Sequence, residues 1–384
     1  VLALAGVWFF NVDNVFADMR FQQGQTYTDA PNAGLNEQIV GLDFLLQAVR
    51  MEPGQDFYYL NLGRSLMNIT DIRRQTGDTQ AGQPKPDARI EDLLRQQDTL
   101  AVQSFIMRQT PLELLSYARI VLERARALNP LNKDHYANLA RLYSFWFSRF
   151  DHNPEQLRQS IEWYRQGHEI APQDVVILNE YAGAVALMGS DAKSRGDEAT
   201  AQASYAQAHE LLEKSKQLDP RYADTDTRLA ELLRIEGRAA EATDRYVALL
   251  ETNPHALDAQ INAIIEGLRG QPDQLKRLRD VYAAAATKKP DDAPLYSFMG
   301  LLSVRAGDLP RASESYARLT QLQPSNVEAR RNYALVLSDT QQYQQAATEA
   351  EAMLALAQQQ QLPQQQTDAI QGLIQYLKAR AAGG

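Results

Sequence analysis

Seven prolines that each end an apolar, helix-like segment recur along this chain at intervals that become regular. They are Pro53, Pro130, Pro172, Pro220, Pro254, Pro290 and Pro324, and the intervals between them are 77, 42, 48, 34, 36 and 34 residues. A proline ends a helix because it lacks the N–H donor and its ring clashes with the preceding turn. Three successive intervals near one value therefore predict a stack of repeated helical units.

Each interval also carries the small and bulky residues that two closely packed helices need. For example, the small residue Ala242 precedes the bulky Tyr246 by four positions. The residues that define the repeat are Gly63, Pro130, Ala242, Pro254, Gly300, Ala312, Tyr316 and Pro324. Gly189, Gly237 and Gly307 are interpreted as turn glycines. The pattern resembles the tetratricopeptide repeat (TPR), whose period is 34 residues. The resemblance implies an all-α fold, a right-handed α-solenoid of about eight antiparallel helix pairs with a C-terminal capping helix.

The repeat pattern also predicts the organisation of the chain. Residues 1–10 are apolar, residues 11–356 form the solenoid, and residues 357–384 form a glutamine-rich linker and a polar-faced capping helix. The 77-residue interval holds an insertion at about 67–109, with a polar loop in its middle, which predicts a protruding helical hairpin. No stretch shows sustained two-residue alternation, so no sheet is expected.

Composition and motifs argue against several functional classes. The formal charge of −9 disfavours nucleic acid as a partner. The chain has no cysteine, and its five histidines show no metal-ligand spacing, so neither a metal nor a cofactor is expected. No phosphate-binding loop, dinucleotide fingerprint or nucleophile elbow occurs. We therefore predict no catalytic residue in this chain and expect it to bind proteins or peptides, with self-association as a further option.

The predicted binding surface is the groove lined by the first helix of each pair. Asn61 and Asn138 occupy one repeat position, and Arg64 and Arg141 occupy another, three residues further on. Together with Asn179, they form a row that could hold carboxylates or the polar groups of an extended chain. The alternative is that these are solvated surface groups.

The N-terminal run Val1 to Phe10 is apolar but too short to span a bilayer. It is either a buried first helix or the end of a longer membrane helix. The stretches 56–64 and 125–143, with this start, resemble the C-terminal TPR region of bacterial O-antigen ligase/polymerase-like membrane proteins. That resemblance implies a scaffold attached to a membrane through its N-terminal segment, with the catalytic residues of the glycan-transferring parent outside this chain. Two alternatives are a free-standing TPR adaptor in envelope or secretion assembly and the TPR region of a glycosyltransferase truncated at its C-terminus.

Overall fold

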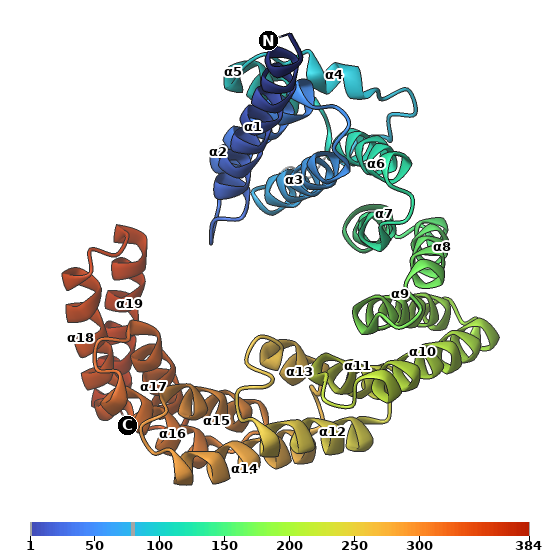
Figure 1. The fold of residues 1–384 in the computed structure, drawn as a ribbon. Coiled ribbons are helices and arrows are strands. Elements are labelled where there is room, and N and C mark those ends of the chain that lie inside the picture. Colours follow the sequence, from blue (N-terminus) through green and yellow to red (C-terminus); the bar gives the residue numbers. More distant parts are fainter. Residues whose placement is uncertain (1, 78–80, 384) are drawn as a thin grey trace. The chain divides into compact units, whose positions relative to one another are not determined.

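The computed structural model describes residues 2–77 and 81–383, and in these residues it contains nineteen α-helices, one short π-helix and no strand (Figure 1). The chain divides into two compact units, Val1–Asp219 and Pro220–Gly384. The helices of the first unit are α1 (Leu2–Thr28), α2 (Leu35–Met51), α3 (Asp56–Gln75), α4 (Ile90–Leu94), α5 (Thr99–Arg108), α6 (Pro111–Leu128), α7 (Lys133–Trp146), the π-helix η1 (Phe147–Asp151), α8 (Pro154–Ile170), α9 (Val175–Ser194) and α10 (Glu198–Leu218). Those of the second unit are α11 (Ala223–Ile235), α12 (Ala239–Thr252), α13 (Ile261–Gly267), α14 (Pro272–Lys288), α15 (Ala293–Arg305), α16 (Leu309–Leu322), α17 (Val327–Asp339), α18 (Tyr343–Gln359) and α19 (Gln364–Ala382).

Helices that follow one another in the repeat pack as antiparallel pairs. Among the described residues, the closely packed pairs are α1/α2, α3/α6, α7/α8, α9/α10, α11/α12, α15/α16 and α17/α18. The sixth repeat, formed by α13 and α14, is degenerate, because α13 has only seven residues. The last helix, α19, packs on α18. The fold is therefore the all-α, TPR-type solenoid with a C-terminal capping helix that the proline period predicts.

The small residues of the repeat set how closely paired helices approach. A Cβ atom added at Gly63 would lie 2.6 Å from Cγ of Leu122, and one added at Gly300 would lie 2.7 Å from Cε1 of Tyr316. Gly189 has the same role, because it lies inside α9 with Tyr205 Cε1 at 2.7 Å from the position of its Cβ. It is therefore not a turn glycine, and its prediction as one was wrong.

The other repeat-defining residues lie where the period places them. Ala242 and Ala312 are fully buried, and Tyr316 is 3% exposed. The helices before Pro130, Pro254 and Pro324 end at Leu128, Thr252 and Leu322. Gly237 and Gly307 have φ angles of 91° and 75°, a left-handed conformation that carries a steric cost for residues with a side chain. Proline and glycine therefore mark the ends of the helices.

The sequence predicts that the insertion in the 77-residue interval protrudes. In the structure it lies against the first repeats instead. Helix α5 packs on α2, and α4 contacts α2 and α6. The Arg50 guanidinium donates to the carbonyl oxygens of Leu94 at 3.3 Å and Gln96 at 2.7 Å. The Arg73 guanidinium donates to those of Ile106 at 2.7 Å and Gln109 at 2.8 Å. These bonds satisfy carbonyl groups at helix ends, which would otherwise lack partners.

The sequence predicts that the N-terminal segment attaches the chain to a membrane, but the structure does not support this prediction. Helix α1 runs without a break through the predicted boundary at residue 10 and pairs with α2 as the first helix of a repeat. Within the described part of the chain, no helix combines the length and apolar character needed to cross a bilayer. The predicted membrane association through this segment is therefore wrong: ten apolar residues do not make a span when polar residues follow within the same helix.

Candidate functional site

An apolar groove of about 530 Å³ lies between α17 and α19 in the second unit. Both helices pack on α18, whose Met353 lines the groove with 2% of its surface exposed. Leu335 of α17 and Leu373 of α19 line the walls, and Leu335 is 40% exposed. Large apolar side chains that remain accessible in a concave site are the usual lining of a binding pocket.

The rim of this groove is polar but carries no net charge. On α17, the Arg331 guanidinium lies 3.1 Å from the Glu328 carboxylate, as an exposed ion pair one helical turn apart. On the other wall, Gln366 belongs to the glutamine-rich segment that the sequence identified as a linker. In the structure this segment is part of the site. The Gln360 side chain donates to the carbonyl oxygen of Ser325 at 2.9 Å, which ties the α18–α19 turn to the start of α17.

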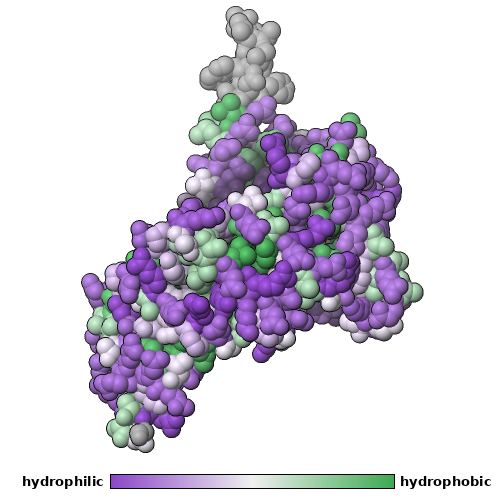
Figure 2. Space-filling model, turned by 90° about the horizontal axis from the view of Figure 1, so that it is seen from below, coloured by the Kyte–Doolittle hydropathy of each residue, from purple (hydrophilic) through white to green (hydrophobic). Residues whose placement is uncertain are grey.

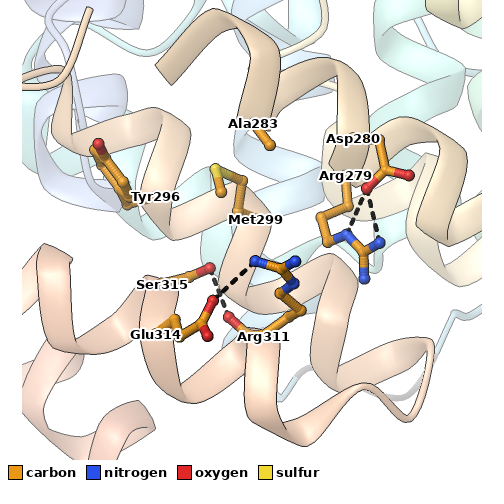
Figure 3. A pocket seen from close by; sticks show the side chains of 8 residues that line it. All are labelled: Arg279, Asp280, Ala283, Tyr296, Met299, Arg311, Glu314 and Ser315. Atoms are coloured by element: carbon orange, nitrogen blue, oxygen red, sulfur yellow. Dashed lines mark hydrogen bonds and ion pairs between the residues drawn. The ribbon is translucent and has the colours of Figure 1, made fainter. Parts of the chain in front are cut away.

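A smaller pocket of about 270 Å³ lies between α14, α15 and α16 (Figure 3). Met299 and Ala283 line it together with two pairs of opposite charges. Arg279 Nη2 is 2.7 Å from Asp280 Oδ1, and Arg311 Nη1 is 3.0 Å from Glu314 Oε2. Because these charges already bind one another, the pocket offers a ligand little that is unsatisfied.

A second aspartate strengthens this arrangement. Arg279 also pairs with Asp308, at the start of α16. Burial lowers the pKa of the Arg279 guanidinium, but hydrogen bonds to Asp280 and Asp308 outweigh this effect, so the pKa is raised overall. We interpret this pocket as part of the packing interface between consecutive repeats.

The predicted asparagines of the first unit are mostly covered. The side-chain amide of Asn61 donates to the backbone carbonyl oxygen of Phe57 at 2.9 Å, and that of Asn138 donates to the backbone carbonyl oxygen of Asp134 at 2.7 Å. Both bonds span one helical turn. Asn138 is 5% exposed and Asn179 is fully buried, whereas Asn61 is half-buried. Only Asn61 therefore retains side-chain surface that a ligand could contact without a rearrangement.

The two predicted arginines differ in their environment. Arg141 makes a bidentate ion pair with Glu180 of the next repeat, at 3.0 Å from Nε and 2.8 Å from Nη2. Burial lowers the pKa of the Arg141 guanidinium, but the hydrogen bonds to Glu180 outweigh it and the pKa is raised. Arg64 is exposed and has no ion-pair or hydrogen-bond partner among the described residues. The repeat position is thus shared, but only Arg64 keeps a free guanidinium.

No group of histidine and acidic residues in the described part of the chain is arranged to hold a metal ion. His255 lies between two carboxylates, with Nδ1 2.9 Å from Asp258 and Nε2 3.0 Å from Asp292. Both ring nitrogens face a carboxylate, so the imidazole links the irregular segment after Pro254 to the start of α15.

Stacked antiparallel helix pairs with this period define the class of the protein as a TPR-type α-solenoid. Among solved structures, the chain is similar to yeast Tom70, with 14% identity and a TM-score of 0.46, over 95% of this chain and 64% of that chain. A tetratricopeptide repeat protein from Parabacteroides merdae has 12% identity and a TM-score of 0.37, over 94% and 98% of the two chains. The TPR protein TTC0263 of Thermus thermophilus has 17% identity and a TM-score of 0.33, over 62% and 95%. No protein-family model and no curated protein matches the chain.

Proposed function

We propose that this chain is an interaction scaffold that holds an uncharged, apolar peptide segment of a protein partner in the groove between α17 and α19. The observation that carries the proposal is the accessible apolar lining, in which Leu335 and Leu373 face a space of about 530 Å³ over Met353. In a stack of repeats, helices of neighbouring units form extended surfaces of this kind.

The chemistry of the groove specifies the partner. Burying one large aliphatic or aromatic side chain of the peptide would contribute about 1.5–3 kcal/mol. The amide of Gln366 can donate to a peptide carbonyl and accept from a peptide N–H. Because Glu328 and Arg331 neutralise each other, the rim does not favour a strongly acidic or basic peptide. Binding should therefore depend little on salt concentration.

Selection from a displayed library of short random peptides, followed by calorimetry, tests this proposal. Peptides selected on the unaltered chain should be uncharged and apolar, and their affinity should fall by more than about tenfold for Leu335→Glu. Leu131→Glu is a matched control, because Leu131 is 80% exposed and lies outside the groove. Peptides that bind Leu335→Glu as tightly as the unaltered chain would contradict the proposed site.

We also propose a polar contact surface in the first unit, formed by Asn61 and Arg64. What supports it is the exposed guanidinium of Arg64, which is one helical turn from Asn61 on α3. A carboxylate is the group that such a guanidinium binds best. An acidic peptide whose affinity falls for Arg64→Ala but not for Arg74→Ala would support this surface. Equal affinities for the two variants would argue against it.

The resemblance to O-antigen ligase/polymerase-like proteins remains a prediction about a longer parent protein, and it rests on residues 56–64 and 125–143 alone. An immunoblot of native cells with an antibody against residues 30–384 tests this prediction. A band well above 43.1 kDa would favour a glycan-transferring parent with further domains. A band near 43.1 kDa would contradict it and favour the free-standing adaptor.

A further inference from the structure

Helix α1 carries a stripe of exposed apolar side chains on the side opposite its contact with α2. The buried side of α1 includes Ala17 and Phe21, which are 0% and 5% exposed. Val15, Phe16 and Met19 lie on the other side and are 57%, 50% and 51% exposed. These three side chains belong to adjacent turns of one helix, so they form one continuous patch.

This patch is unusual for the chain. The other large apolar side chains that are well exposed in the described residues are distributed over many elements, for example Met51, Leu131 and Leu218. On the face of the molecule shown in Figure 2, hydrophobic residues likewise form small areas separated by hydrophilic ones. Single exposed apolar residues need no explanation, but several on one helical stripe indicate a contact with another helix.

Charged residues beside the stripe indicate which helix fits. Asp13 and Arg20 are seven residues apart, so they lie on the same flank of the stripe. In an antiparallel pair of α1 helices related by a twofold axis near residues 16 and 17, Asp13 of each copy would face Arg20 of the other. In a parallel pair, one flank of each helix faces the opposite flank of its partner, so Asp13 and Arg20 could not pair with each other.

Neither charge is held in a way that prevents this contact. Asp13 is exposed. The Arg20 guanidinium donates to the Gln23 side chain at 2.9 Å and lies 5.6 Å from the Phe44 ring centroid, and its bond to Gln23 is exposed to solvent. An exposed bond of this kind costs little to exchange for an ion pair.

We propose that α1 is a self-association surface, through which two copies of this chain form a symmetric dimer with antiparallel α1 helices. Val15, Phe16 and Met19 form the apolar centre of the contact, and Asp13 and Arg20 form ion pairs at its edges. The surface lies on the first helix of the first unit, whereas the proposed peptide groove lies in the second. The dimer therefore does not depend on the proposed function.

Sedimentation equilibrium of the 384-residue chain tests the dimer directly. We expect a mass about twice 43.1 kDa at high concentration. Phe16→Glu should weaken the association by more than about tenfold without changing the melting temperature, because Phe16 is half exposed. Tyr376→Glu is the matched control, since Tyr376 is 53% exposed on α19. A monomer at all concentrations, a Phe16→Glu variant that dimerises normally, or a mass that keeps growing beyond the dimer would overturn the proposal.

Two further variants test the antiparallel geometry. Asp13→Arg should weaken the dimer, and the double variant Asp13→Arg/Arg20→Asp should restore it, because the charges are then exchanged on both copies. The chain has no cysteine, so Phe16→Cys introduces a single thiol next to the proposed twofold axis. Under mild oxidation, it should form a disulfide-linked dimer more readily than Tyr376→Cys. A double variant as weak as Asp13→Arg, or equal cross-linking at both positions, would rule out this arrangement.

Discussion

Gly300 and Tyr316 face each other between α15 and α16, so closely that a Cβ added at Gly300 would lie 2.7 Å from both Cε1 and Cζ of the tyrosine ring. Tyr316 is 3% exposed, so its ring is enclosed by neighbouring groups. The same relationship joins Gly189 to Tyr205 in the first unit. In both pairs the glycine precedes the tyrosine by sixteen residues. The contact between them sets the distance between the two paired helices.

Gly300→Ala should therefore destabilise the second unit. Overpacking of a tight contact typically costs about 1–3 kcal/mol, which urea unfolding followed by circular dichroism would measure. Gly372→Ala is the control, because nothing lies within 4 Å of the position its Cβ would occupy in α19. That substitution should stabilise the chain by about 0.5–1 kcal/mol, since alanine favours helix over glycine. A neutral Gly300→Ala would show that the ring can move aside.

Arg73→Ala should loosen the contact between the insertion and the first repeats. Arg73 is 7% exposed, and its guanidinium binds the carbonyl oxygens of Ile106 and Gln109. Leaving these acceptors without a partner costs about 1–3 kcal/mol. Limited proteolysis within residues 81–109 should become faster, while Arg64→Ala, at an exposed arginine of the same helix, should leave the rate unchanged. Similar rates in both variants would mean that apolar contacts alone hold the insertion.

A double-mutant cycle on Arg141 and Glu180 should give a measurable coupling energy. The pair is bidentate, but the Arg141 side chain is 41% exposed, so solvent screens much of the attraction. We expect a coupling of about 0.5–1 kcal/mol that decreases as salt is added. A coupling near zero at low salt would show that the two repeats are held together by their apolar contacts without help from this pair.

The stability of the second unit should depend on the protonation of His255. The carboxylates of Asp258 and Asp292 raise the pKa of its imidazole above the value of about 6.5 in an unfolded chain. The protonated ring therefore stabilises the fold. This contribution is fully present below the unfolded pKa and is lost as pH rises through the folded pKa. Urea unfolding of the unaltered chain and of His255→Gln should differ most at about pH 5 and converge toward about pH 8. A constant difference would contradict the ion pairs.

The repeat architecture could be predicted from the sequence because its signals are local. Pro130, Pro254 and Pro324 follow helix ends because the proline ring cannot continue a helix, whatever surrounds it. Ala242 and Ala312 are buried because the second helix of each pair must approach its neighbours closely. These effects need only the period and the residue type, and both are visible in one sequence.

Tertiary structure decided the features that join residues far apart in the chain. Arg141 is paired because Glu180, 39 residues further on, lies opposite it on the next repeat, whereas Arg64 at the equivalent position has no such partner among the described residues. The insertion lies against the first repeats because Arg50 and Arg73 reach its carbonyl groups. The groove exists because α17 and α19, which are not consecutive, leave Leu335 and Leu373 accessible across α18. The period determines which helices form, but the spacing between non-consecutive helices depends on every side chain packed between them.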